Sequence, residues 1–447
     1  MYILTNGKLI TRDPAAKGYY EHGAVVFEGT KIVEVGDAAA LAAKYPQAEK
    51  LDARGGVIMP ALINAHTHIY SALARGLSIA GNNPTNFFEV LDGTWWAIDR
   101  HLTLEGTRAS ADALYIDCIK QGVTTIFDHH ASYCEIPGSL FQIAESAKKF
   151  GVRSCLCYEV SDRDGEEKCL EAIKENADWI TYCKEHNDPM LAAMFGGHAL
   201  FTISDKTFDR MVAANNGRTG YHIHVSEGMN DVYDSLQNYG RRPVQRLQDH
   251  GILGEKTILG HCIHVNTAEM EIIKETGTMV VNNPESNMGN AIGICPVLQL
   301  YKRGILLGMG TDAYTNDMLE SLKVALCSQR SQNCLPNVGW CEVTDMLFKN
   351  NARIGAKYFP DELGVLKAGA AADIIVMDYK PFTPFSDENI DGHMIFGMTG
   401  RQCQTTIAAG KILMRDRELV GIDEEAENAH ILEAAKKLWG SLNHREY

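Results

Sequence analysis

The sequence predicts an α/β fold: a (β/α)8 barrel of the TIM type, joined to a small β-sandwich domain formed from both chain ends. Two observations lead to this prediction. The middle of the chain alternates β-rich runs with helical patterns over about 300 residues, as parallel barrels do. Both ends instead carry short strands separated by turns. The predicted divisions are 1–56 and 362–420 for the small β domain, 57–361 for the barrel, and 421–447 for a C-terminal amphipathic helix.

The barrel strands are predicted from short runs rich in β-branched and other apolar residues. Segments between them, such as ALYIDCIKQG and LFQIAESAKKFG, have helical apolar spacing and end at glycine. The eight predicted strands are 57–65, 123–128, 152–159, 191–197, 220–225, 257–262, 278–283 and 305–312.

The two chain ends share a sequence pattern that differs from that of the middle. YILTNGKLIT and GAVVFEGTKIVEVG alternate β-branched and polar residues around Asn-Gly and Glu-Gly turns, and residues 372–379 and 405–416 repeat this pattern. In the last segment, Ile431, Ala435, Leu438 and Leu442 form one apolar stripe of a helix, which we expect to pack on the barrel or on a partner.

Composition excludes several classes of function. The 447 residues carry a net charge of −15, and such an acidic surface repels nucleic acids and anionic membranes. No apolar run approaches the roughly 18 residues of a membrane span, and the N-terminus does not resemble a signal peptide. The 12 cysteines include no CxxC pair, so we expect reduced thiols and a cytoplasmic protein. A small molecule is therefore the expected partner.

Polar side chains end four of the predicted strands. His66 and His68 end the first, His224 the fifth, His261 the sixth and Asp312 the eighth, and Glu227 lies three residues beyond His224. Carboxyl ends of barrel strands meet at one rim, where catalytic groups gather.

These side chains suit a catalytic metal ion. Imidazole and carboxylate bind Zn²⁺ or Fe²⁺, and the ion acidifies a bound water at neutral pH. Asp312 would take the proton of that water, and Glu227 would deliver a proton to the substrate. A lone strand-end histidine is usually only hydrogen-bonded, but this ordered set is a strong signal.

The same residues carry a family resemblance. MPALINAHTH, HVSE, LGHC, SNM and GMGTDA, with LGVLKAGAAADIIVMD near the end, resemble signatures of the amidohydrolase superfamily, in its cytosine deaminase- and chlorohydrolase-like branch. DHHAS, SNMGN and NIDGHMIFGM resemble the SsnA-type aminohydrolases found with purine and selenium-linked catabolic genes.

The resemblance implies roles residue by residue. His66, His68, His224 and Asp312 would hold one divalent metal, with His261 beside the attacking water and Glu227 as the proton donor to nitrogen. Zinc is expected, with iron or manganese as alternatives. Two departures stand out: Ala61 replaces the usual signature glycine, and Asn282 stands where many members have a substrate-facing histidine.

Other residues are candidates for the substrate pocket. We name Arg75, His129, His130, His198 and Asn282. His222 is a weaker candidate for contact with the metal than His224. Residues 77–103 form a long segment that is rich in aromatic residues. For Trp95 and Trp96 we favour a place in a helix core or a dimer interface. For Phe87 and Phe88 a lid over the substrate is left open as the alternative.

The resemblance also bears on the reaction. Two-metal members carry a bridging lysine after the fourth strand, but LAAMFGGHALF has none, which favours one metal and deamination of a purine-like heterocycle. Opening of a cyclic amide and a non-catalytic scaffold are the alternatives. We also expect a homodimer, as family members often form.

Overall fold

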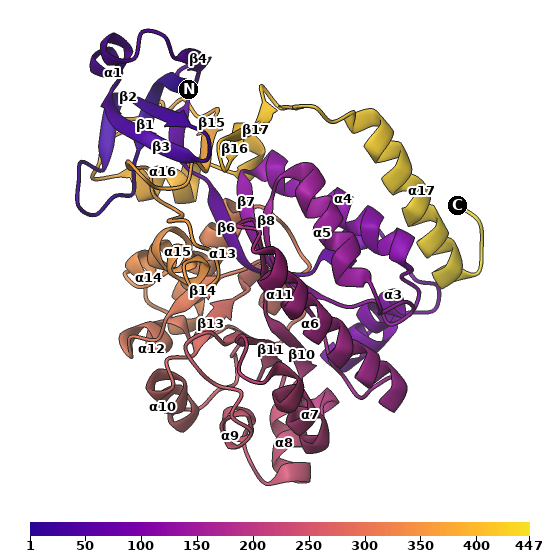
Figure 1. Cartoon of the computed structure of the whole chain (residues 1–447). Helices are drawn as coiled ribbons and strands as arrows, with labels where there is room; N and C mark the ends of the chain where they lie inside the picture. Colours follow the sequence, from indigo (N-terminus) through magenta and orange to yellow (C-terminus); the bar gives the residue numbers. More distant parts are fainter.

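Eight parallel strands form a barrel in the computed structural model, which describes residues 1–447. Figure 1 shows the arrangement of the chain. They form two sheets, of orders β6-β7-β8-β9 and β10-β11-β12-β13-β14. The barrel strands are β6 Leu62–Thr67, β7 Val123–His130, β8 Arg153–Tyr158, β9 Leu191–Ala193 continued by β10 Phe195–Ala199, β11 Tyr221–Val225, β12 Ile258–His261, β13 Met279–Asn282 and β14 Leu307–Met309.

Two bridges close these sheets into a ring. Val160 pairs with Gly197, and Thr67 pairs with Asp312. At the second seam the amides of Thr311 and Asp312 donate to the His66 carbonyl, at 2.9 and 3.0 Å. The predicted fold class is confirmed, and the seam itself joins the first strand to the last beside three of the predicted site residues.

The small β domain is one nine-stranded sheet. Its order is β18-β17-β16-β15-β5-β1-β2-β3, with β4 also paired to β1. Its strands are β1 Tyr2–Ile10, β2 Tyr19–Glu28, β3 Lys31–Asp37, β4 Glu49–Asp52, β5 Val57–Pro60, β15 Ile374–Met377, β16 Cys403–Ala408, β17 Lys411–Arg415 and β18 Glu418–Leu419. Figure 1 shows strands from the two ends of the chain side by side in it.

The run predicted as one strand over 57–65 is two strands. β5 pairs with β1 and with β15 in the small sheet, whereas β6 begins the barrel. Ala61 separates them, and its amide donates to the Asp373 carbonyl at 3.1 Å. We therefore propose that the boundary between the two units lies at Ala61, a few residues later than expected.

Helices cover the barrel between its strands. Helix α4 shows how one is bounded: the Thr103 side chain accepts from the Gly106 amide, and Gly122 ends the helix at φ +77°. The longer helices are α4 Leu104–Gln121, α5 Ser139–Phe150, α6 Glu166–His186, α7 Asp205–Asn215, α8 Met229–Tyr239, α10 Thr267–Glu275, α13 Met318–Asn333 and α17 Glu424–Asn443. None of the helices is both long and apolar enough to cross a membrane.

The C-terminal helix α17 packs on its own barrel, alongside α4 (Figure 1). Ala434, Leu438 and Leu442 are buried, and Ile431 and Ala435 are partly buried. The Trp439 indole also donates to the Leu73 carbonyl at 2.8 Å. Because Leu73 lies in the 3-10 turn Ile69–Ala74, which directly follows His68, the helix supports the segment that leaves the site.

Candidate metal centre

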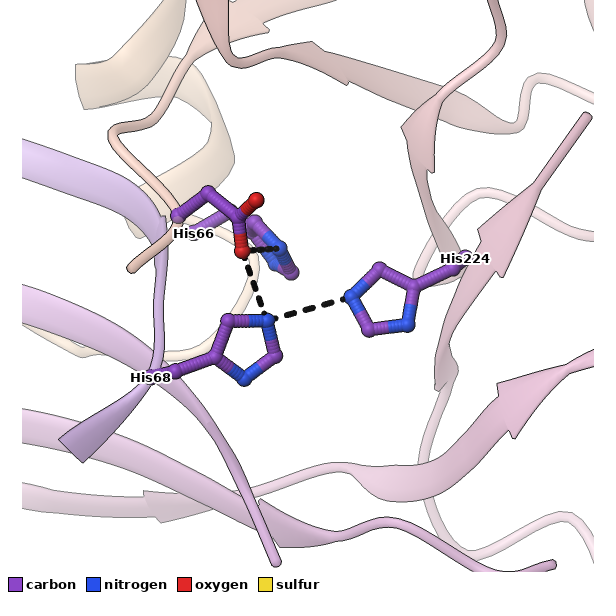
Figure 2. Close-up of side chains that lie close together, drawn as sticks. His66, His68 and His224 are labelled. Carbon is purple, nitrogen blue, oxygen red and sulfur yellow. Dashed lines mark hydrogen bonds and ion pairs between the residues drawn. The ribbon is translucent and has the colours of Figure 1, made fainter. Parts of the chain in front are cut away.

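Four of the predicted ligands meet at the rim of the barrel. His66 and His68 come from the end of β6, His224 from β11, and Asp312 from the turn after β14. Each offers a ligand atom within 4.8 Å of the others. Figure 2 shows the imidazoles of His66, His68 and His224 pointing toward one another.

Hydrogen bonds behind two of these rings decide which nitrogen faces the centre. His68 donates from Nδ1 to the His129 carbonyl at 2.5 Å, and His224 donates from Nδ1 to the His198 carbonyl at 2.8 Å. In the neutral form of each ring, Nε2 therefore carries the lone pair, and these two atoms lie only 3.2 Å apart. Two facing lone pairs repel unless a cation lies between them, so the pair fits a metal ion.

The third imidazole is held in a similar way. His66 Nδ1 lies 2.8 Å from Nε2 of His222, and His66 Nε2 is buried without a hydrogen-bond partner. A buried unpaired nitrogen is costly, and a metal ion would satisfy it. His222 thus contacts a candidate ligand, and its own Nε2 is already engaged.

The electrostatics also favour a positive ion. Burial lowers the pKa of His66 to about 3 and the pKa of His224 well below its usual value, which keeps both rings neutral. Burial alone would lower the pKa of His68 too, but Asp312 Oδ1, 2.8 Å from its Nε2, raises it to about 9. The space between this nitrogen and this oxygen therefore stabilises positive charge, as a metal site must.

Glu227 and His261 lie beside this group. Their side chains and that of Asp312 are within 4.8 Å of one another, and His261 Nε2 is 3.6 Å from Glu227 Oε1. His261 Nδ1 lies 2.7 Å from Asn287 Oδ1, and the Asn287 amide donates to Asn282, so Nδ1 carries the proton and Nε2 is free to accept. Burial, and then the charge of Asp312, raises the pKa of Glu227 well above its usual value.

A cavity opens beside these groups. Its apolar wall includes Trp95 and Trp96, which come from the helical segments Leu91–Trp95 and Trp96–Asp99. Trp96 is buried in its helix and Trp95 packs against the core, so both side chains join the protein core to the cavity wall. The lining residues are His68, Tyr70, Phe87, Leu91, Trp95, Trp96, Glu159, His198, His224, Glu227, Asn290, Asp312, Ala313 and Tyr314. Aromatic faces beside titratable groups suit a flat heterocycle.

Of the five predicted pocket residues, two line a cavity in the structure and three do not. His198 lines this cavity, and Arg75 lines an adjoining one that shares Trp95, Asp312 and Tyr314. Arg75 pairs with Asp117 there, at 3.0 Å.

The other three candidates do not line either cavity. His129 and His130 are fully buried, the first between Glu159 and two backbone carbonyls, and the second against Ser132. Asn282 accepts from Asn287 behind His261. These side chains support the site from beneath, so the prediction that they face the substrate gains no support from the cavity.

Sequence reasoning missed Glu159. It follows β8 directly, lines the cavity and is 2% exposed. The signal was present, since the run 152–159 ends in this carboxylate as other runs end in histidine.

Glu159 also belongs to a second group of potential ligands, with His68, His129 and His224. His129 cannot serve an ion there, because its Nε2 lies 3.1 and 3.0 Å from the Gly197 and His222 carbonyls. A nitrogen that faces two carbonyl oxygens must donate a proton. Of these two groups, only the one formed by His66, His68, His224 and Asp312 therefore presents free lone pairs to one point.

A parallel barrel with three histidines and an aspartate at its carboxyl rim defines the class of metal-dependent hydrolases. Within that class the chain belongs to the amidohydrolase family, because the model of that family matches residues 57–413. The protein is therefore a hydrolase of carbon–nitrogen bonds. Residues 23–48 also match an imidazolonepropionase-like composite domain of bacteria.

Relatives and solved structures resemble the whole chain. A 5'-deoxyadenosine deaminase of Methanosarcina mazei is 30% identical, over 99% of each chain. A 5-methylthioadenosine/S-adenosylhomocysteine deaminase of Thermococcus sibiricus is 31% identical, over 87% of this chain and 89% of its own. The zinc-bound crystal structure of an adenosine deaminase from Xanthomonas campestris superposes with a TM-score of 0.83, at 23% identity and 98% coverage of both chains.

Proposed function

We propose that this protein is a metal-dependent aminohydrolase that removes an amino group from a purine-like heterocycle. The observation that carries the proposal is the group of free ligand atoms from His66, His68, His224 and Asp312, with Glu227 and His261 beside it. The aromatic cavity next to this group and the deaminase names of full-length relatives support the same reaction.

Different residues of the chain would bind the metal ion, accept the proton of the water and donate a proton to the substrate. A divalent ion held by the four ligands would lower the pKa of a water molecule and so supply a nucleophile at neutral pH. Asp312 would take the proton of that water, and His261, whose Nε2 accepts, would orient it. Glu227, kept protonated by burial and by Asp312, would donate a proton to a ring or leaving nitrogen.

We propose one zinc ion per chain. Three imidazoles and one carboxylate suit zinc, and iron or manganese are the alternatives. The fourth strand and its exit, LAAMFGGHALF, contain no lysine to bridge a second ion. Opening of a cyclic amide stays the second candidate reaction, and no feature of the cavity favours it over deamination.

A substrate screen tests the proposal. Zinc-loaded protein is mixed with adenosine, 5'-deoxyadenosine, adenine, guanine and a pterin, and both ammonia release and ultraviolet absorbance are followed. We expect ammonia release with the ring chromophore retained for at least one compound. Loss of the ring chromophore without ammonia would instead establish ring opening, and Asp312→Asn serves as the inactive control.

We also propose a cytoplasmic homodimer that acts in purine catabolism. All 12 cysteines are free, as in reducing compartments, and Phe382 and Phe396 expose large apolar side chains. Sedimentation at micromolar concentration should give twice the 49.3 kDa chain mass. A monomer mass would refute the dimer.

A further inference from the structure

A cavity of about 670 Å³ lies at the amino ends of the barrel strands. Its lining includes β9 and the residues that lead into β11 and β12, with residues 356–360 after helix α15 Asn351–Gly355 on another side. Because β11 carries the candidate ligand His224 near its carboxyl end, this cavity and the metal centre lie at opposite ends of the barrel. Its volume is in the range of small-molecule sites, and the proposed reaction does not use it.

Positive charge gathers at this cavity, although the whole chain carries a net charge of −15. The lining contains one carboxylate, Asp188, and four cations, which are Lys184, Arg218, Lys256 and Lys357. Of the four cations only Lys357 forms an ion pair, with Glu255 at 3.4 Å. Three positive charges are therefore left without a carboxylate partner, and a cleft of one sign attracts ions of the opposite sign.

Arg218 is held in place by neutral groups alone. Its Nε donates to the Asn215 carbonyl at 3.1 Å, and its Nη2 donates to the Ala214 carbonyl at 2.7 Å. Its Nη1 donates to the Thr181 hydroxyl at 2.9 Å and to the Ala177 carbonyl at 3.4 Å. A guanidinium has five N–H groups, so one remains for a ligand. These bonds orient the guanidinium without neutralising it, which lowers the entropic cost of binding an anion.

The deeper part of the cavity is apolar. Phe359 is 4% exposed, and Ile180 and Leu191 are also buried, whereas Lys184 and Lys256 are exposed at the surface. The Phe359 ring packs nearly perpendicular to Phe127 inside the barrel, with centroids 6.1 Å apart. The cavity therefore combines an apolar floor with cations at its mouth, which suits a ligand with an apolar body and an anionic group.

The same features disfavour two other classes of ligand. A metal ion would need more donors than Asp188, and burial raises the pKa of the lining Cys183 to about 12, which keeps its thiol protonated. A long polyanion such as a nucleic acid would extend past the cavity onto the acidic remainder of the surface, which repels it. A small anion fits within the cavity and avoids that repulsion.

From these contacts we propose that the cavity at the amino ends of the strands is a second ligand site, which binds a small molecule made of a flat apolar ring and a phosphate group. The ring would lie on the floor formed by Ile180, Leu191 and Phe359. The phosphate would pair with Lys184, Arg218 and Lys256. Two sources supply this chemistry: mononucleotides and other aromatic phosphates.

The test removes two of the unpaired charges and compares the result with a matched control. The cavity variant is Lys184→Gln/Lys256→Gln. The control is Lys50→Gln/Lys436→Gln, which lowers the net charge equally at two exposed lysines of β4 and α17 that do not line the cavity. All four side chains are exposed, so both variants should fold, and equal melting temperatures will verify this.

Binding is measured by calorimetry on the zinc-loaded protein, with naphthyl phosphate, naphthol and inorganic phosphate as probes. We expect naphthyl phosphate to bind at least about tenfold more tightly than either of the other two, because the floor and the cations both contribute. The cavity variant should weaken its binding about tenfold or more, and the control by about twofold or less.

Adenosine monophosphate then distinguishes the two sources. It is titrated into zinc-loaded Glu227→Gln protein, in which turnover is slow, with and without the cavity substitutions. A similar loss of affinity would identify mononucleotides as ligands, and a loss confined to naphthyl phosphate would identify other aromatic phosphates.

Three outcomes would overturn the inference. They are an affinity for naphthyl phosphate that the cavity variant leaves unchanged, an equal loss in the control variant, and inorganic phosphate that binds as tightly as naphthyl phosphate. The second would show an effect of net charge alone, and the third would show that the apolar floor takes no part. Because ammonia release is not measured, the result does not depend on the proposed deaminase reaction.

Discussion

Two carboxyl groups beside the metal centre have pKa values displaced in opposite directions. Burial raises the pKa of Glu227 well above its usual value, whereas the neighbouring imidazoles of His66 and His68 outweigh burial and lower the pKa of Asp312. One group is thereby kept as an acid and the other as a base, which is the arrangement that acid–base catalysis requires.

Substitution of the two carboxyl groups should have different effects on zinc content and turnover. Asp312→Asn removes a charged ligand, so both zinc content and turnover should fall. Glu227→Gln should keep its zinc and lose about 10² to 10⁴ in kcat, because the amide cannot deliver a proton. Metal analysis and kcat are measured on the same samples. A Glu227→Gln protein that loses zinc, and recovers activity in excess zinc, would contradict the role of proton donor.

Glu285 predicts a pH dependence of stability. Burial raises its pKa to about 7, the Ser321 hydroxyl donates to its Oε2, and its Oε1 has no partner. The folded state therefore holds this proton more tightly than the unfolded state, and the free energy of unfolding falls as pH rises from about 4.5 to about 7.

Glu285→Gln should remove this loss. The variant should match the native protein near pH 4.5 and exceed it above pH 7, by about 1 to 3 kcal/mol. Denaturant unfolding at several pH values measures the difference. A constant difference across this pH range would contradict the prediction.

At the scale of the element, helix α17 stabilises the chain through its buried face. Leu438→Ala should cost about 2 to 4 kcal/mol of unfolding free energy, because Leu438 is buried against the barrel. Leu432→Ala, on the opposite face and 57% exposed, is the matched control and should change stability by about 0.5 kcal/mol or less. Equal losses in the two variants would show that α17 does not pack as described.

The elements also show what sequence could predict. Each of the eight runs overlaps a barrel strand because buried parallel strands need continuous apolar residues, which a single sequence displays. The division of 57–65 into β5 and β6 could not be predicted, because it depends on pairing with β15, more than 300 residues later.

The same limit applies at the site. Their positions at strand ends predicted that His66, His68, His224 and Asp312 would lie together, since strand ends share one rim of a barrel. Sequence could not separate His198, which lines the cavity, from His129, which lies beneath it. That distinction depends on side-chain direction and on hydrogen-bond partners, such as Glu159 for His129 and Thr202 for His198.

At the scale of the whole molecule, the metal should couple to folding. Four ligands from β6, β11 and the β14 turn join distant parts of the barrel, so zinc that binds only the folded state must raise its stability. We expect about one zinc per chain by elemental analysis, and a lower melting temperature after chelation that zinc restores. Two tightly bound ions per chain would contradict the single site.

The position of β5 between β1 and β15 has a consequence for biosynthesis. Its four buried residues are translated early, but Ile374–Met377, which complete its pairing, are 314 residues further along than Pro60. At about 5 to 20 residues per second, a nascent chain exposes this apolar strand edge for roughly 15 to 60 s. A product of interrupted translation never covers it. The sheet therefore distinguishes finished chains from truncated ones, and it leaves the latter open to chaperones and proteases.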